Sequence, residues 1–357
     1  MSKKYKFEVN LSSPANFEVT RALGEPHSTT GYTDAQLQRF ADYIKYIVDK
    51  GLAEPNRPIK VSFYAGGGGT ELILSQATKF AGYAKDYVDI IACSLPVRDV
   101  YEHREELFAL ARLLGDKLLV NTHYDFGMDV DPAVEIDTPG TPRYNLRWLF
   151  ARGLGTYVSA FATTQNIGNF MAVFDDFLTL RKSVPNLKCD VVVDPIEDAG
   201  AAPIDEATAR AALSAIAAYL ETHPELQGAF NYRMTHAVRE DRKPDALMSN
   251  VVAVMAEGGV IYPGYDVPFM TAKALDDFPL GIIEDDFDLL ENRRAELIAQ
   301  LPESSETLDG GCNDMLRSVP WVDEDGEWSL TPSDNLCILH SLLAEYLPRR
   351  DGASNVA

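Results

Sequence analysis

Short apolar runs alternate with longer amphipathic stretches along much of the chain. Between residues 59 and 195 the short runs are rich in β-branched residues and bounded by Gly, Pro or Asp, which is typical of buried strands. The stretches between them have the spacing of apolar residues that favours helices. Strands and helices in regular alternation indicate βα units around a parallel sheet.

Six βα units are predicted in this way. The strands are expected at residues 6–11, 59–64, 88–93, 117–122, 156–163 and 188–194. The helices are expected at residues 34–50, 71–87, 97–114, 142–152, 167–184 and 204–222. Six such units suit a partial barrel, so we expect an α/β fold of the partial (β/α)6 TIM-like type.

The pattern changes at about Gly228, where a second, smaller region begins. Residues 250–255 and 260–263 predict a β-hairpin, because the glycines of Glu257-Gly258-Gly259 allow the positive φ that its turn needs. Two further helices are expected at residues 285–301 and 336–347. We therefore expect a βα barrel over residues 1–228 and a small α+β extension over residues 229–357.

Composition narrows the function classes. The chain has 357 residues, 46% of them hydrophobic, which is enough for a large core. Its formal charge of -22 works against partners that are bound through their phosphates, so we expect no direct nucleic-acid binding and no membrane role for this acidic protein. No apolar run is long enough to span a membrane and no secretory signal is recognisable, so a cytoplasmic location is expected.

Four cysteines are present, at positions 93, 189, 312 and 337, and no two of them form a C-x2-C or C-x3-C pair. This spacing indicates neither a disulfide framework nor an evident metal site. Cys312 and Cys337 could join His340 in a small metal site, but zinc binds four ligands and only three can be named. Buried, inert thiols are the alternative, and the one that we favour.

Four glycines, Gly66, Gly67, Gly68 and Gly69, separate the second strand from its helix and are followed by Thr70. Backbone N–H groups at a helix N-terminus can receive an anionic ligand, and glycine lets the ligand approach closely. The run is not a phosphate-binding P-loop because no Lys follows it. A tight turn that brings strand and helix together is the structural alternative.

Polar residues stand where barrel enzymes carry their chemistry, at the carboxyl ends of strands. Asn121, His123 and Asp125 follow one strand, and Thr163 and Asn166 follow another. A histidine beside an aspartate could act as an acid or base near neutral pH. The candidate catalytic residues are the titratable ones at the strand ends and beside the glycine run: His123, Asp125 and Glu71. A structural role for each is the alternative.

Several landmarks, in order along the chain, resemble radical S-adenosylmethionine (SAM) enzymes with a SPASM-type C-terminal extension. The run from Phe7 to Phe17 resembles the family's first strand and cluster loop, and Gly66–Gly69 resembles its Gly-Gly-Glu-Pro segment. In the extension, Tyr262-Pro263-Gly264 resembles a Tyr-Pro-Cys hairpin end, and Gly310-Gly311-Cys312 resembles the end of an auxiliary cluster motif. The segment around Cys337 resembles the opening of the last helix.

The ligands themselves are missing from these landmarks. The resemblance places the three C-x3-C-x2-C positions on Ala15, Val19 and Ala22, and an auxiliary cysteine position on Gly264. None of these side chains can bind iron. The resemblance therefore implies no iron-sulfur cluster. SAM remains a candidate cofactor, and its implied contacts lie on the glycine loop with Thr70 and on three residues at strand ends: Asn121, Thr163 and Asn166.

Two functions remain open on these grounds. The first is a pseudoenzyme that binds a peptide or small ligand in the barrel groove, with an active radical SAM protein as a further partner. SPASM proteins commonly modify peptides, so the resemblance implies a peptide. The second is a repurposed, cluster-free enzyme of transferase or hydrolase type that uses the glycine loop and the polar strand ends.

Overall fold

The computed structural model describes residues 6–11, 31–52, 59–64, 69–124, 126, 137–193, 203–233, 251–255, 257–263, 279–300, 321–322, 328–329 and 334–348. Its contacts divide the chain into two units. The first unit comprises Met1–Val120, Arg242–Ser305 and Ser318–Leu330. The second comprises Asn121–Asp241, Glu306–Arg317 and Thr331–Ala357. The domain boundary expected at residue 228 stays a prediction.

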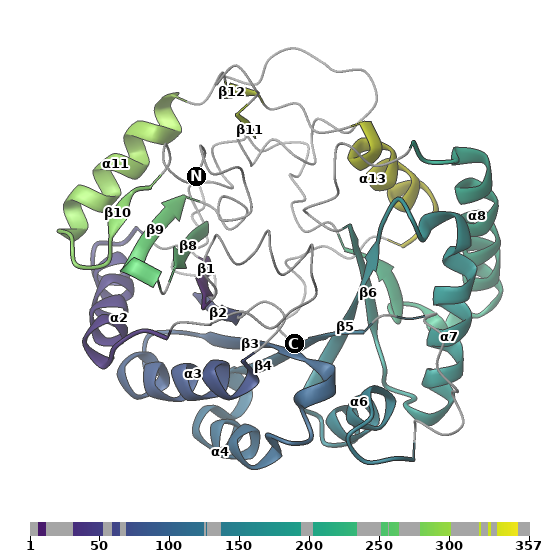
Figure 1. Ribbon diagram of the computed structural model, residues 1–357, viewed down its shortest axis with the longest axis horizontal. Coiled ribbons are helices and arrows are strands. Elements are labelled where there is room, and N and C mark those ends of the chain that lie inside the picture. Colours follow the sequence, from purple (N-terminus) through teal and green to yellow (C-terminus); the bar gives the residue numbers. More distant parts are fainter. Residues whose placement is uncertain are drawn as a thin grey trace. The chain divides into compact units, whose positions relative to one another are not determined.

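Each of the first six strands is followed along the chain by a helix, as the sequence predicts (Figure 1). The strands are β1 (Lys6–Asn10), β2 (Lys60–Tyr64), β3 (Ile90–Pro96), β4 (Leu118–His123), β5 (Gly155–Ala162) and β6 (Cys189–Val193). The corresponding helices are α2 (Asp34–Asp49), α3 (Thr70–Ala84), α4 (Arg104–Leu114), α6 (Pro142–Ala151), α7 (Phe170–Ser183) and α8 (Glu206–Thr222).

The predicted helix at residues 97–114 begins later than expected. Residues 97–114 were predicted as one helix, but only α4, from Arg104, is helical, and Val97–Asp99 forms a separate 3-10 turn, η1. Four more 3-10 turns are found among the described residues: η2 (Gly115–Lys117), η3 (Ile167–Asn169), η4 (Pro224–Leu226) and η5 (Glu257–Gly259). The start of the predicted helix is therefore wrong, and its end is confirmed.

In the first unit the strands lie in the order β10-β9-β8-β1-β2-β3, where β8 is Val251–Met255, β9 is Val260–Pro263 and β10 is Gly281–Ile282. Strand β1 pairs in parallel with both β2 and β8. Strands β8 and β9 pair antiparallel, which confirms the predicted hairpin. Its glycines have the positive φ that the turn needs, 69° at Gly258 and 64° at Gly259.

Aromatic side chains fill the core of the first unit between the strands and helices α2 and α3. The ring of Phe40 lies 5.7 Å from that of Phe7 on β1 and 5.2 Å from that of Phe80 on α3, and Phe63 on β2 completes the cluster. Because strand side chains alternate between faces, Ser62 lies on the opposite face of β2 from Phe63. Helix α11 (Phe287–Gln300) lies beside α2, and strands β11 (Trp321–Val322) and β12 (Trp328–Ser329) form a separate pair (Figure 1).

In the second unit β5, β6 and β7 (Phe230–Tyr232) pair in parallel in that order. The three-residue β7 was not predicted from the sequence. Phe230 packs against Phe174 and Phe177 of α7, with ring centres 5.0 and 5.1 Å away. The face of the strands that carries Phe230 is therefore the face that α7 covers. Helix α13 (Asp334–Tyr346), predicted at residues 336–347, packs on α8 and β6. No helix among the described residues is long and apolar enough to cross a membrane.

Candidate functional site

The glycine run ends at the N-terminus of α3. Gly69 is the residue before the helix and has a φ of 95°, a conformation that glycine adopts without strain. Thr70 is buried, and its hydroxyl donates a hydrogen bond to Oδ2 of Asp99 over 3.3 Å. Glu71 is exposed in the first turn, where its carboxylate interacts favourably with the helix dipole. The roles of these three positions toward a ligand stay predictions, and Gly66, Gly67 and Gly68 lie outside the described residues.

Strand β4 carries two of the predicted site residues near its carboxyl end. Asn121 and His123 are partly buried and share one face of the strand. The ring of His123 lies 4.3 Å from that of Phe161 on β5, at an interplanar angle of 32°. Phe161 is 37% exposed, so its ring forms an accessible aromatic surface beside the partly buried His123. Asp125, the expected partner of His123, lies outside the described residues.

Thr163 and Asn166 brace the turn that follows β5. The backbone N–H of Thr163 donates to Oδ1 of Asn166 over 2.9 Å, and the backbone N–H of Asn166 donates to Oγ1 of Thr163 over 3.2 Å. The amide group of Asn166 also donates to the carbonyl of Phe161 over 2.9 Å. This reciprocal bonding fixes the turn, so both polar side chains have a structural use in addition to the predicted contact with SAM.

A polar row on β5, β6 and β7 was missed by sequence reasoning. The strand register pairs Ser159 with Asp190 and Asp190 with Asn231. All three side chains lie on the face opposite the α7 helix, because Phe230 is on the helix-covered face and neighbouring residues alternate. Asp190 is fully buried and Asn231 is 3% exposed. The only sequence signal was one charged residue inside the apolar strand Cys189–Val193.

Arg233 reaches across this row from the end of β7. Its guanidinium Nη1 donates a hydrogen bond to the hydroxyl of Tyr157 over 2.5 Å and lies 3.8 Å from Oδ2 of Asp190. Its guanidinium carbon lies 5.0 Å from the centre of the Tyr157 ring. The side chain of Arg233 is 22% exposed. A buried carboxylate is costly without a cation nearby, and Arg233 supplies that charge.

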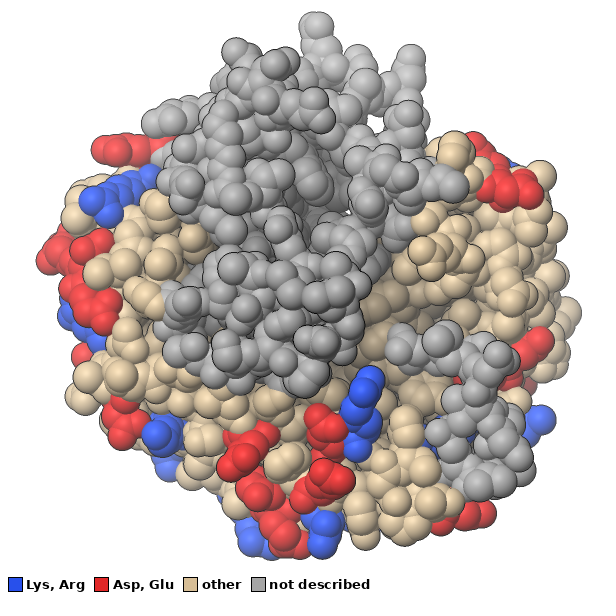
Figure 2. Space-filling model, in the orientation of Figure 1, with Lys and Arg blue, Asp and Glu red and all other residues tan. Residues whose placement is uncertain are grey.

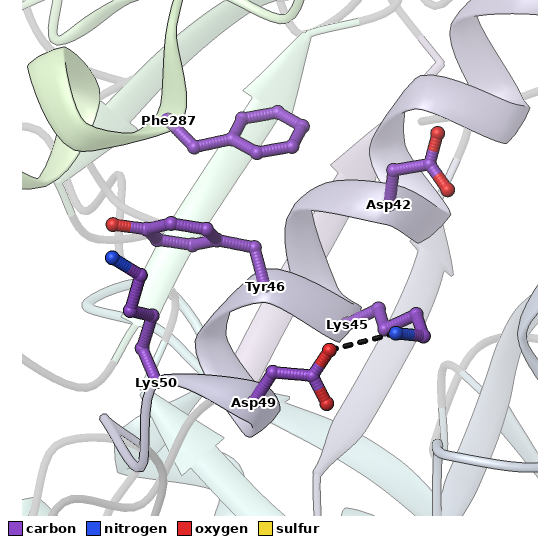
Figure 3. Close-up of a pocket in the computed structure, with 6 residues that line it drawn as sticks. All are labelled: Asp42, Lys45, Tyr46, Asp49, Lys50 and Phe287. Carbon is purple, nitrogen blue, oxygen red and sulfur yellow. Dashed lines mark hydrogen bonds and ion pairs between the residues drawn. The ribbon is translucent and has the colours of Figure 1, made fainter.

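A shallow cleft in the first unit lies between α2 and α11 (Figure 3). Tyr46 and Phe287 form its aromatic wall, with ring centres 5.4 Å apart. Lys45 forms an ion pair with Asp49 over 2.7 Å at its edge, and Asp42 and Lys50 complete the lining. The Tyr46 hydroxyl donates to Asp288, which raises the pKa of Tyr46 to about 12. The cleft is thus formed by the contacts that hold α11 on α2.

The two cysteines whose side chains the structure describes are unsuited to binding metal. Cys93 and Cys189 are fully buried. Burial raises the pKa of Cys93 to about 12 and that of Cys189 well above its usual value, so both stay protonated. Among the described residues, no three His, Cys, Asp or Glu side chains gather as a metal site would require.

The remaining cluster positions fall where the structure gives no side-chain detail. Ala15, Val19, Ala22, Gly264 and Cys312 lie outside the described residues, and the side chain of Cys337, in α13, is also not described. His340, the third candidate ligand, is buried, and its Nδ1 shares a hydrogen bond with the hydroxyl of Tyr232. This bond uses one ring nitrogen of His340 to join α13 to β7.

Charge is spread without a dominant basic patch on the visible described surface (Figure 2). Lysine and arginine side chains there are interspersed with aspartate and glutamate. Binding to the phosphates of a nucleic acid needs clustered cations. The described part of this face offers no such cluster.

The described strands and helices form an α/β fold of the partial (β/α)6 barrel type, similar to the fold of radical SAM enzymes with a SPASM-type extension. The chain is similar to anSMEcpe, an anaerobic sulfatase-maturating radical SAM enzyme with a SPASM domain, solved in its native form with bound AdoMet. The TM-score is 0.62, the identity is 15%, and 96% of each chain is covered. The same enzyme with AdoMet and the Cp18Cys peptide gives a TM-score of 0.60 at 15% identity, again with 96% of each chain covered. No protein-family model and no curated protein sequence matches the chain.

Proposed function

We propose that this chain is a radical-SAM/SPASM-like protein that has lost its iron-sulfur ligands and acts as a pseudoenzyme, binding a peptide or small ligand in its barrel groove. One observation carries the proposal. The segment that connects β1 to α2, residues 11–33, contains no cysteine at all. Radical SAM enzymes need three thiolates to hold their cluster, and the proposal assigns their positions in this segment to Ala15, Val19 and Ala22.

No other cysteines compensate for this loss. The chain has four cysteines in total, and Cys93 and Cys189 are buried with raised pKa values. Only Cys312 and Cys337 remain, which is one thiolate short of the three that a cluster with an open iron requires. The residues present therefore do not fit an iron-sulfur cluster, and no step of radical chemistry is assigned to this chain.

The choice of ligand rests on the solved neighbours and on the site. Neighbouring structures contain AdoMet, and two of them also contain a peptide, Cp18Cys or Kp18Cys. A peptide or small molecule in the groove is therefore the ligand that we propose, and an active radical SAM protein is the proposed partner. SAM itself stays a candidate ligand of the loop Gly66–Gly69, in which glycine replaces the carboxylate of the family's motif.

Anaerobic reconstitution with iron and sulfide tests this proposal. The wild-type chain is expected to gain no thiolate-to-iron absorbance. The triple variant Ala15→Cys, Val19→Cys, Ala22→Cys restores the C-x3-C-x2-C spacing and serves as the matched control, with cluster uptake expected. Stoichiometric uptake by the wild-type chain would overturn the proposal, whatever the variant does.

A cluster-free hydrolase is the second candidate, and one observation favours it. His123 lies partly buried at the carboxyl end of β4, where barrel enzymes place their acids and bases. Hydrolysis of p-nitrophenyl acetate and p-nitrophenyl phosphate tests this candidate. The pseudoenzyme predicts no turnover above background. Turnover by the wild type that is lost in His123→Ala would favour the enzyme instead.

A further inference from the structure

We propose that the cleft between α2 and α11 is a docking site for an arginine side chain of a partner peptide, bound between the rings of Tyr46 and Phe287 and the carboxylate of Asp42 (Figure 3). All of these residues belong to the first unit. None of them belongs to the glycine loop or to the strand ends on which the proposed function depends. The inference therefore goes beyond that function and concerns a separate partner.

The cleft is large enough for a side chain and open enough for a peptide to reach it. Its volume is about 450 Å³, within the usual range of ligand sites. Four of the lining residues are exposed: Asp42, Lys45, Asp49 and Lys50. A free small molecule would keep much of its surface in water in so open a site, whereas a peptide can add contacts beyond the rim. We therefore expect a peptide as the occupant.

The aromatic rings of the cleft already interact with cations of the chain itself. The guanidinium carbon of Arg39 lies 3.7 Å from the centre of the Phe287 ring, and Nζ of Lys50 lies 5.3 Å from the centre of the Tyr46 ring. Such cations are attracted by the negative face of an aromatic ring. The hydroxyl of Tyr46 donates to Asp288, so Tyr46 offers its ring to a ligand and not its hydroxyl.

One negative charge of the cleft has no cation of its own. Lys45 lies 2.7 Å from Asp49, and Lys50 lies 3.7 Å from Asp288. Asp42 is exposed and forms no hydrogen bond or ion pair within the described part of the chain. The hydrogen bond and the charge of Asp49 raise the pKa of Lys45 most, and Asp42 adds a smaller electrostatic contribution. A single positive charge from a partner would therefore complete the charge balance.

A guanidinium fits the ring and the carboxylate together. Asp42 and Tyr46 are four residues apart on α2, so their side chains are neighbours on the helix surface. A planar guanidinium can lie against an aromatic ring while its N–H groups donate to a carboxylate, and it is more weakly hydrated than an ammonium group. Arg39 lies over Phe287 in this way while it donates to two backbone carbonyls. The formal charge of -22 attracts a basic partner over a longer range.

A ligand-observed NMR titration of the full chain tests the inference. The probe is a short peptide, blocked at both ends, with one arginine between glycine and serine residues. Its matched form carries citrulline, which has the shape of arginine without its charge. At about 0.15 M salt, which screens the field of the net charge, the arginine peptide should bind saturably and about threefold or more tightly than the citrulline peptide. N-acetyl-arginine amide should bind more weakly than the arginine peptide.

Two pairs of variants assign the binding to this cleft. Asp42→Asn should keep the melting temperature of the wild type, because the side chain is exposed, and should weaken the arginine peptide about two- to fivefold. Asp116→Asn changes the net charge equally at an exposed position elsewhere in the first unit and should bind like the wild type. Tyr46→Leu and Tyr46→Phe both lose the hydroxyl, but only Tyr46→Leu loses the ring and should bind more weakly.

Four results would each overturn the inference: no saturable binding of the arginine peptide, equal binding of the arginine and citrulline peptides, equal affinities of Asp42→Asn and Asp116→Asn, or equal affinities of Tyr46→Leu and Tyr46→Phe. If N-acetyl-arginine amide bound as tightly as the peptide, the ligand would be a small guanidinium compound and the peptide assignment would be wrong. None of these results bears on the proposed function, which cluster uptake by the wild-type chain tests separately.

Discussion

The guanidinium carbon of Arg39 lies 3.7 Å from the centre of the Phe287 ring. The same side chain donates hydrogen bonds to the carbonyls of Ile283 and Asp285, over 3.3 and 2.9 Å. One residue of α2 thus binds both the turn before α11 and the first residue of that helix. Tyr43 adds a hydrogen bond to Glu291 over 2.6 Å. In the first unit, α11 is therefore fastened to α2 by polar contacts as well as by packing.

Removing Arg39 should loosen α11. Arg39→Ala deletes a cation–π contact and two hydrogen bonds, and should lower the free energy of unfolding by about 1–3 kcal/mol. Hydrogen exchange should accelerate first in residues 287–300. Arg39→Lys keeps the charge but loses the planar guanidinium group. Its free energy of unfolding should therefore lie between those of the wild type and Arg39→Ala. Arg112→Ala, at an exposed arginine of α4, is the control. Equal exchange in all of these proteins would contradict the role of Arg39.

Two ion pairs of α6 offer a matched comparison of burial. Arg143 pairs with Asp176, and their side chains are 2% and 10% exposed. Arg147 pairs with Asp137, and their side chains are 35% and 76% exposed. Asp176→Asn should cost about 3–5 kcal/mol of unfolding free energy, because it leaves a buried cation without its counter-charge. Asp137→Asn should cost less than about 1 kcal/mol. Urea unfolding measures both, and similar losses would show that burial does not decide the cost.

The repeating elements of the fold were predictable because each carries its own local signal. The strand ending at Tyr64 and the helix beginning at Thr70 are recognisable in the sequence, because the spacing of apolar residues changes across the glycine run between them. The hairpin turn at Gly258 was predictable because its φ of 69° favours glycine. Strand β7 was missed because three residues, Phe230–Tyr232, are too few to establish a period.

The polar row on β5, β6 and β7 was not predictable, because its members carry no shared local signal. Asp190 is a single charge in an apolar strand, and its cation, Arg233, stands on another strand after an intervening helix. Only the register of β5, β6 and β7 brings them together with Tyr157. Asn166 follows a strand, where the family resemblance implies a contact with SAM, and the structure shows that Asn166 braces its own turn.

The stability of the α2–α11 contact should depend on pH in the acid range. The hydrogen bond from Tyr46, followed by the charge of Lys50, lowers the pKa of Asp288. A carboxyl whose pKa is lower in the folded state stabilises the fold above its unfolded pKa of about 3.9, and this contribution is lost as the pH falls through the folded value. Asp288→Asn should therefore lower the urea midpoint at pH 6 and leave it nearly unchanged at about pH 2.

A control variant separates this effect from general acid unfolding. Asp116→Asn removes an exposed carboxyl from the same unit, and its midpoint should follow the wild type at every pH. The pKa of Tyr46, raised to about 12 in the wild type, should also fall toward about 10 in Asp288→Asn, because its acceptor has lost its charge. If the urea midpoints of the wild type and Asp288→Asn differed by the same amount at pH 6 and at about pH 2, the predicted pH dependence would be contradicted.

The thiols of Cys93 and Cys189 should be inert in the folded protein. Both are fully buried, and burial raises the pKa of Cys93 to about 12, so its thiol stays protonated at pH 8. Iodoacetamide reacts with the thiolate, so native protein at pH 8 should be labelled at neither residue, and protein in urea should be labelled at both. Mass spectrometry of the digested protein assigns the label to each cysteine.

Ser214→Cys, at an exposed position of α8, is the positive control. Its new cysteine should be labelled rapidly in native protein at pH 8, which shows that the reagent is active. If Cys93 or Cys189 were labelled at a rate comparable to that in urea, the side chain would open to solvent often enough to present a thiolate. That cysteine would then be available as an iron ligand. Protection of both residues leaves Cys312 and Cys337 as the only thiols that iron could meet, which is fewer than the cluster of the radical SAM enzymes requires.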